Sequence, residues 1–274
     1  MGKNKLNFAF FGTPDVASKT LDILKENGYL PSIIITSPDK PQGRKMVLTP
    51  PPVKTWAIEN NIPYLQPEKI NEEFTLKLST FNFQLSVVVA YGKILPEVLI
   101  NTPKLGTINI HYSLLPKYRG ASPVEACLLN GDTETGVSIQ QMAYKLDSGN
   151  IIAEEKLNIG INDTKVELLE KLIKMGGHLL CKIIPHIINQ NLNPNIQDES
   201  QSTFCGKIKK EDGEIDPNGN PILNWNKYRA FFGWPGVFFF KNGKRIKITK
   251  AKYENDSFII ERVIPEGKKE TIWK

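Results

Sequence analysis

Cysteine and histidine are both scarce in this chain of 274 residues, which has three of each. The cysteines Cys127, Cys181 and Cys205 are odd in number, far apart and without C-x-x-C spacing. This pattern argues against a disulfide framework and a zinc site, and the cytoplasm is the expected location. His178 and His186 lie in one predicted helix without an acidic residue at metal-site spacing, so we expect no bound metal.

Long apolar runs and several catalytic motifs are also missing. The apolar stretches fall well short of the ~20 residues that a membrane span needs, and the first residues do not have the pattern of a signal peptide. The segment "FFGTPD" is not the G-x-G-x-x-G fingerprint, which argues against an NAD enzyme. No G-x-S-x-G is present, and Ser113 has no separate base and orienting group, so nothing supports covalent catalysis.

The positive charge is confined to the end of the chain. Residues 204–274 contain 15 Lys and Arg against 9 Asp and Glu, which accounts for the whole net charge of +6. A lysine-rich tail is often only solvated surface. A neutral body joined to a basic segment is nevertheless the pattern expected when that segment binds a polyanion.

Strands and helices alternate in the first two thirds of the chain. The strands carry little polar alternation, which indicates an α/β fold with a mostly parallel, Rossmann-like sheet covered by helices on both faces. For the first helix we expect Thr13 as the cap, Pro14 at the first helical position and Gly28 at the exit. Thr164 and Glu167 have capping-box spacing. Strands are expected within 5–12, 31–37, 81–92, 106–112 and 135–142, and helices within 13–28, 53–61, 122–131 and 164–190.

The remaining residues predict a second, smaller domain. The polar stretch 189–203 has the composition of a linker between a catalytic domain at 1–188 and a small basic β domain at 204–274. In the latter, Asn242-Gly243 stands between two runs of strand-forming residues and predicts a two-residue hairpin.

The segment "GTINIHY" places an amide and an imidazole together. Side chains alternate along a strand, so Asn109 and His111 share one face while Ile108 and Ile110 share the other. Open α/β sheets bind their ligands at strand ends of this kind. Asn109 can donate to a developing oxyanion, and His111 can donate a hydrogen bond or move a proton near neutral pH. The alternative is a hydrogen-bonded structural histidine.

A carboxylate is available in "YKLDSGN", in the loop after the next strand. Asp147 precedes Ser and Gly there, which also suits an ordinary turn residue. We expect its strand to neighbour that of Asn109 and His111. An amide, an imidazole and a carboxylate without a nucleophile suit direct transfer of an acyl group to an amine.

At "NIHYSLLPKYRGASP", "LDSGNII" and "FFGTPDVA" the chain resembles the 10-formyltetrahydrofolate-dependent formyltransferases, and among them most closely those that formylate methionyl-tRNA. The resemblance implies that Asn109 and His111 hold the formyl oxygen, while Asp147 sets the protonation of His111 and relays protons. It also implies that three segments surround the folate. The residues in question are Ser113, Leu114, Leu115, Pro116, Tyr91, Gly92, Ile94, Leu95, Met142 and Leu146.

The resemblance also implies the acceptor, the α-amine of methionine on initiator methionyl-tRNA. The Pro- and Gly-rich loop 37–54 resembles the family loop that grips the tRNA acceptor end, with Arg44 at its functional arginine and Lys45 beside it. The basic tail resembles an OB-like barrel that contacts tRNA phosphates, in which Lys244, Arg245 and Lys247 are the candidates. At family level a monomer is expected.

The tail departs from the family pattern, because fewer residues than usual separate "KITKA" from "VIPEGKKE". We therefore expect an abbreviated barrel, which bears on tRNA binding more than on the chemistry. Three alternative functions remain. The first is a nucleotide-amino-sugar N-formyltransferase with the same catalytic residues, the second is a formyltetrahydrofolate hydrolase with water as acceptor, and the third is an RNA-binding module on an inactive scaffold. The basic loop and tail argue against the sugar N-formyltransferase, and the expected lack of an N-terminal regulatory domain argues against the hydrolase. The presence of the complete trio of Asn109, His111 and Asp147 argues against the RNA-binding module.

Overall fold

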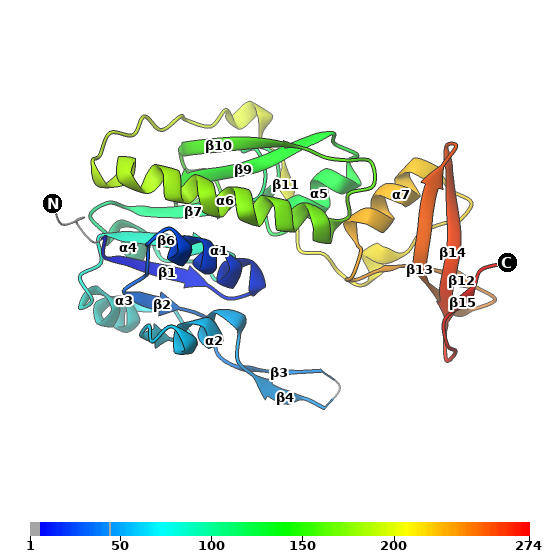
Figure 1. Cartoon of the computed structure of the whole chain (residues 1–274), viewed down its shortest axis with the longest axis horizontal. Coiled ribbons are helices and arrows are strands. Elements are labelled where there is room, and N and C mark those ends of the chain that lie inside the picture. The colour runs from blue at the N-terminus through cyan, green and yellow to red at the C-terminus, as the bar shows by residue number, and fades with distance from the viewer. Residues whose placement is uncertain (1–5, 44) are drawn as a thin grey trace. The chain divides into compact units, whose positions relative to one another are not determined.

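The computed structural model of the chain describes residues 6–43 and 45–274 (Figure 1). Its contacts divide into two compact units, one comprising residues 1–116, 136–155 and 172–201, the other 117–135, 156–171 and 202–274. The helices are α1 (Asp15–Glu26), α2 (Pro52–Glu59), α3 (Glu72–Ser79), α4 (Glu97–Asn101), α5 (Pro123–Leu129), α6 (Lys165–Ile188) and α7 (Pro221–Ala230).

The first unit is built on a seven-stranded sheet in the order β10-β9-β7-β6-β1-β2-β5. The neighbours from β7 to β5 pair in parallel, whereas β9 runs antiparallel to β7. The mostly parallel sheet predicted from the sequence is therefore confirmed, and the antiparallel pairing of β9 with β7 is one that the pattern did not indicate. The strands are β1 (Phe8–Gly12), β2 (Ile33–Ile35), β5 (Tyr64–Leu65), β6 (Leu85–Val89), β7 (Thr107–His111), β9 (Glu134–Gln141) and β10 (Ile151–Asn158).

Helices cover this sheet on both faces, and each face is identified by its contacts. On one face, a Cβ at Gly176 of α6 would lie only 3.0 Å from Ile110 Cγ2, so the missing side chain lets α6 approach β7. The neighbouring Gly177 meets Ile23 of α1 in the same way. On the other face, α3 and α4 close an apolar cluster that includes Phe11, Val88 and Leu99. Because Ile110 points toward α6, Asn109 and His111 point to the side of this cluster.

The predicted start of α1 is wrong by one residue, whereas that of α6 is confirmed. Pro14, expected at the first helical position, stands at the cap of α1 in place of Thr13, and no side chain caps that helix. The Thr13 hydroxyl instead donates to the Tyr91 carbonyl and lies 3.1 Å from Ser37 Oγ, because tertiary partners at the ends of neighbouring strands compete for it. At α6 the capping box forms: Glu167 accepts from Thr164 N at 2.9 Å, and Glu167 N donates to Thr164 Oγ1 at 3.4 Å.

The second unit contains a four-stranded antiparallel sheet in the order β12-β13-β14-β15. Asn242 and Gly243 have positive φ and join the first two of these strands, which confirms the predicted hairpin. Helix α7, capped by Asn220, packs against β13 and β14. The strands are β12 (Val237–Lys241), β13 (Lys244–Glu254), β14 (Ser257–Pro265) and β15 (Thr271–Ile272), and a separate short pair joins β8 (Arg119–Gly120) to β11 (Phe204–Cys205).

Candidate active site

Polar side chains line one face of β7 and β9. In the antiparallel register Asn109 lies opposite Gln140, and His111 lies opposite Ser138. Directly opposed residues project to the same side of a sheet, so these four side chains share the face away from α6. Asn109 is half-buried, whereas the other three are buried. A polar group on a covered sheet face is costly unless it is hydrogen-bonded or used.

The predicted carboxylate reaches this face. Asp147 Oδ2 lies 3.7 Å from His111 Nδ1, and the two side chains are 14% and 6% exposed. The sequence therefore predicted correctly that β7 and β9 are neighbours and that Asp147 lies close to His111. At this distance the attraction between the imidazole and the carboxylate is electrostatic, since a hydrogen bond is shorter. Partial exposure of Asp147 and Asn109 leaves the face open to a reactant.

The backbone of the Asp147 loop is fixed at three points. Asp147 has φ +46°, a left-handed conformation that Asp adopts more readily than most residues. A Cβ at Gly149 would lie 1.6 Å from the Gln141 carbonyl oxygen, so no larger residue fits there. The buried Gln197 donates from Nε2 to the carbonyls of Asp147 (2.9 Å) and Gly149 (2.6 Å). The glycine of the L-D-x-G sequence is therefore required by the loop geometry that presents the carboxylate, and the positive φ before it suits Asp147.

Ser138 connects the strand to the segment predicted to contact the folate. Its hydroxyl accepts from Leu115 N at 2.9 Å and lies 2.7 Å from the Ser113 carbonyl. It also lies 2.5 Å from Glu154 Oε1 on β10. Of the predicted residues in this segment, Ser113 and Leu115 are buried, and Leu114 and Pro116 are half-buried. The contacts of Ser138 hold the turn after His111 against β9.

The two other predicted folate segments border one apolar cluster. Tyr91 and Leu95 are buried members of it, and Met142 packs against it. Burial raises the pKa of the Tyr91 phenol, which stays neutral. Gly92 turns the chain at φ +77°. Ile94 and Leu146 are instead strongly exposed, at 83% and 58%. Each segment is thus anchored in the apolar cluster and also presents an exposed apolar side chain that a ligand can contact.

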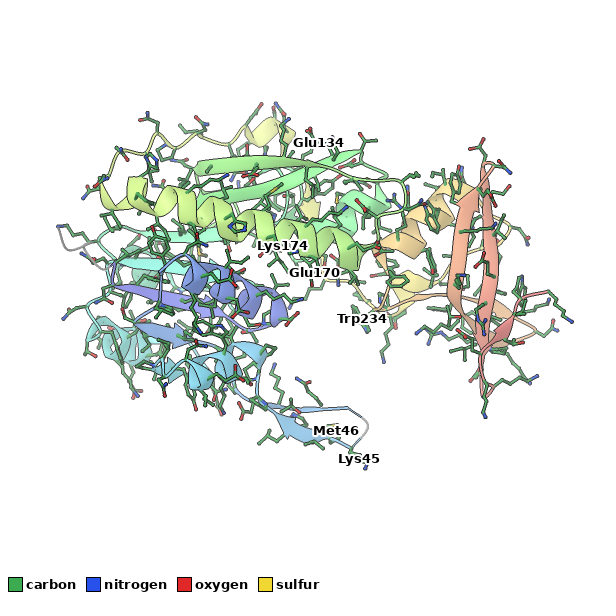
Figure 2. The ribbon with its side chains drawn as sticks, viewed as in Figure 1. Lys45, Met46, Glu134, Glu170, Lys174 and Trp234 are labelled. Carbon is green, nitrogen blue, oxygen red and sulfur yellow. The ribbon has the colours of Figure 1, made fainter. Side chains whose placement is uncertain are left out.

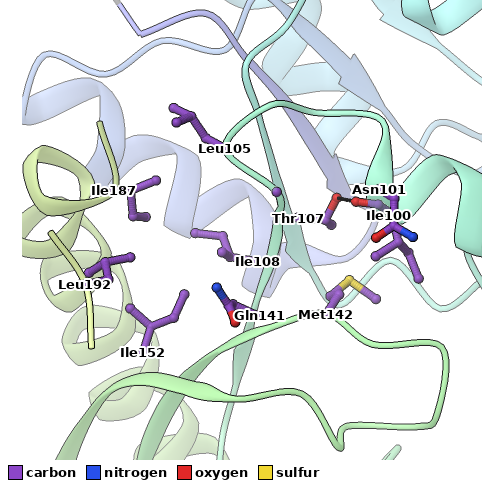
Figure 3. A pocket seen from close by; sticks show the side chains of 11 residues that line it. Ile100, Asn101, Leu105, Thr107, Ile108, Gln141, Met142, Ile152, Ile187 and Leu192 are labelled. Atoms are coloured by element: carbon purple, nitrogen blue, oxygen red, sulfur yellow. Dashed lines mark hydrogen bonds between the residues drawn. The ribbon is translucent and has the colours of Figure 1, made fainter. Parts of the chain in front are cut away.

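A pocket of about 240 Å³ lies elsewhere (Figure 3). It includes Ile108 and Gln141, whose side chains belong to the face of the sheet opposite His111. Thr107 Oγ1 donates to the Ile100 carbonyl in its wall at 2.7 Å. None of Asn109, His111 and Asp147 is among the residues that line it, so this pocket does not hold the chemistry. Its lining residues are Ile100, Asn101, Leu105, Gly106, Thr107, Ile108, Gln141, Met142, Ile152, Ile187 and Leu192.

The basic loop 37–54 contains a hairpin that the sequence did not predict, formed by β3 (Lys40–Gln42) and β4 (Val47–Thr49). Its base is held by Asp39, whose carboxylate accepts from Gln66 (2.7 Å) and Lys54 (2.7 Å), and these bonds keep the pKa of Asp39 below its ordinary value. Lys45 and Met46 are exposed at the tip (Figure 2). Arg44, the other predicted tRNA contact here, lies outside the described residues.

The predicted basic residues of the tail alternate with aromatic rings. On β13, Arg245 stacks its guanidinium 3.8 Å from the Phe238 ring centre. The register pairs Lys247 with Phe238 and Arg245 with Phe240, so these four side chains share one face of the sheet. Lys244 is exposed at the hairpin. Phe240 is exposed, whereas Phe238 is buried, and an exposed ring next to cations can stack with a nucleotide base.

Sequence reasoning did not identify Ser138, Gln140 or Gln197. For the two strand residues a signal existed, since they alternate with Val137 and Ile139 and so predict a polar face. Gln197 had none, because its contacts lie about fifty residues away in the chain. In residues 6–43 and 45–274 we find no group of His, Cys, Asp and Glu that could hold a metal ion. No helix of the same residues is long and apolar enough to cross a membrane.

Family models match both parts of the chain. The formyl transferase model matches residues 5–184, and the model of the formyl transferase C-terminal domain matches residues 207–270. The methionyl-tRNA formyltransferase of Caldicellulosiruptor saccharolyticus is 40% identical over 91% of this chain and 82% of its own length. That of Halalkalibacterium halodurans is 43% identical over 90% and 78%.

Solved structures share the fold at low sequence identity. A methionyl-tRNA formyltransferase from Clostridium thermocellum superposes with a TM-score of 0.64 at 16% identity, covering 95% of this chain and 98% of that one. An N-formyltransferase from Helicobacter canadensis, solved with folinic acid and dTDP-3-aminofucose, gives 0.68 at 21% identity, covering 91% and 89%.

Proposed function

Because this chain belongs to the methionyl-tRNA formyltransferase family, we propose that its polar face transfers the formyl group of 10-formyltetrahydrofolate to the α-amine of methionine on initiator methionyl-tRNA. One observation supports the site most strongly: Asn109 and His111 share a face, and Asp147 Oδ2 lies 3.7 Å from His111 Nδ1. When bound, the folate supplies a formyl group attached to nitrogen. All other chemistry belongs to the side chains of this chain.

Asn109 and His111 act on the formyl oxygen. The oxygen gains negative charge as the amine attacks, and an amide N–H aimed at that charge stabilises it more than the uncharged reactant. Asn109 is placed to donate in this way because it is the half-buried member of the face. His111 is the second donor, held in a nearly water-free position where such a hydrogen bond is strong.

Asp147 controls the protonation of His111. A carboxylate beside Nδ1 favours a proton on that nitrogen. The attacking amine must also lose a proton, and the partly exposed carboxylate is placed to accept it, directly or through a water. The trio thereby supplies both an oxyanion site and a proton acceptor.

The residues of the three predicted segments fit a folate. A pterin is flat and has a polar edge, which suits the exposed apolar side chains of Ile94 and Leu146 together with backbone groups at Gly92. The Ser138 hydroxyl accepts a hydrogen bond from the Leu115 amide, and this bond sets the backbone at Leu115 before a ligand binds. These residues would hold the pterin ring beside the trio.

The tRNA would be held by two basic surfaces. One is the basic loop 37–54, with Lys45 exposed and Arg44 as its predicted contact, and the other is the face of β13 with Arg245 and Lys247. We assign the chemistry to residues 1–188 and the tail contact to 204–274, with 189–203 as the connection; the two family-model matches support this division. The family resemblance also supports a monomer. The cytoplasm is the location that a tRNA substrate and three scattered cysteines support.

An acceptor assay tests the proposal. The assay supplies 10-formyltetrahydrofolate with a labelled formyl group. We expect the label to be transferred to methionyl-tRNA much faster than to a nucleotide-linked amino sugar, and much faster than it is released as formate when no acceptor is present. Preferred labelling of the amino sugar would make this a sugar N-formyltransferase, and release as formate a hydrolase. No turnover of the folate with any acceptor would contradict all three enzymatic functions.

Replacing Arg44 by alanine is expected to raise KM for methionyl-tRNA by roughly tenfold, because one Arg contact to a nucleic acid contributes about 1–3 kcal/mol. The KM for the folate and kcat should change little, and the salt dependence of tRNA binding should weaken. Lys77→Ala, on the exposed side of α3, removes the same charge away from the hairpin and serves as the control. Equal KM values for tRNA in both variants would show that Arg44 does not take part in tRNA binding.

A further inference from the structure

Gln140 is the one strand amide on the polar face to which the proposed mechanism gives no role. It is 1% exposed and lies opposite Asn109 in the β7–β9 register. Of the buried residues of β9, Gln140 carries the largest polar side chain, and a large amide at a buried position is not what packing alone favours.

The Gln140 amide touches the carboxylate of the trio. Its Nε2 donates to Asp147 Oδ1 at 2.9 Å, while Asp147 Oδ2 is the oxygen next to His111. A carboxylate rotates about its terminal C–C bond, and one fixed oxygen sets the position of the other. The bond from Gln140 therefore fixes the rotation of the carboxylate, and with it the position of the oxygen that faces His111. Gln197 donates to the carbonyl groups of Asp147 and Gly149 and thereby holds the backbone of the same loop.

The oxygen of the Gln140 amide provides a second, independent observation. Gln140 Oε1 is buried and, in the part of the chain that the structure describes, has no hydrogen-bonding partner. An unpaired buried acceptor costs free energy, so a glutamine selected only for folding would be replaced by an apolar residue. The presence of glutamine at this position is therefore explained by the hydrogen bond from its Nε2 to Asp147 and not by packing.

We propose that Gln140 is a positioning residue that orients the Asp147 carboxylate toward His111. The inference rests on the proposed function, because it assigns Gln140 a part in the same reaction. Gln140 acts through Asp147 and not on the substrates. Its removal therefore slows the chemical step without weakening the binding of either substrate.

Gln140→Met tests this, because methionine has a similar length and is compatible with a buried site but offers no N–H donor. We expect kcat to fall about tenfold, the scale of one lost hydrogen bond to a charged group, with KM for both substrates within twofold. Gln141→Met is the matched control: it makes the same change at the next position, on the opposite face of β9, and should retain wild-type kcat. A rise in KM with unchanged kcat would instead indicate substrate contact and overturn the proposal.

A comparison with Asp147→Asn separates the two hypotheses. If Asp147→Asn alone is as active as the wild type, the proposed function of the trio fails. If Asp147→Asn is slow but Gln140→Met has wild-type kcat, only the role of Gln140 fails. We expect Gln140→Met to add nothing in the Asp147→Asn background, since a positioning residue has no effect once its target is lost. Should Gln140→Met unfold, Gln140→Leu is measured in the same way, and thermal melting of each variant identifies losses due to folding.

Discussion

Replacing His111 by alanine is expected to lower kcat for formylation of methionyl-tRNA by roughly 10²–10³-fold, the usual cost of one lost oxyanion donor. The reason lies in the position of the imidazole, which shares a face with Asn109 and lies 3.7 Å from Asp147. Steady-state initial rates at saturating folate and tRNA measure this effect.

His178→Ala is the control for that experiment. His178 is exposed on α6 and lies outside the trio, so its loss should leave kcat unchanged. Melting temperatures of the two variants separate damage to the fold from damage to the reaction. Near-full formylation by His111→Ala would mean that the imidazole does not take part, and the mechanism would have to be abandoned.

Asp147→Asn is expected to lower kcat by about 10²-fold or more, within the 10²–10⁴ range of general acid–base groups. The substitution keeps the size of the side chain but removes the charge beside His111 and the proton acceptor for the amine. Asparagine tolerates the φ of +46° at this position, so the loop should keep its conformation.

Asp256→Asn provides a matched comparison for this substitution. Asp256 also has a left-handed backbone, with φ +55°, but lies exposed in the β13–β14 turn. We expect wild-type kcat and an unchanged melting temperature for it. Full activity of Asp147→Asn would show that its carboxylate is not required, and would leave Asn109 and His111 as oxyanion donors without a proton acceptor from the protein.

The sequence was informative where local physics decides the structure. Strand alternation placed Asn109 and His111 on one face, the 164–167 spacing gave the capping box, and Asn242-Gly243 gave the hairpin. These features depend on residues within a few positions of one another. Even the neighbourhood of Asp147 and His111 followed from the order of strands in an α/β fold.

Features that depend on distant partners could not be predicted. Thr13 was expected to cap α1, but Ser37 and the Tyr91 carbonyl, brought together by three strands, bind its hydroxyl instead. The bond from Gln140 to Asp147 depends on how the loop after β9 folds back. That loop is held in turn by Gln197, about fifty residues later.

Single-turnover formylation of methionyl-tRNA by Asn109→Ala, His111→Ala and the double variant tests the central claim most directly. If the amide and the imidazole stabilise the same oxygen, each single variant transfers the label far more slowly than the wild type while binding both substrates normally. The double variant should then lose less than the product of the two separate effects, as residues acting as a unit do. Rapid transfer by either single variant would contradict the claim that this face carries out the reaction.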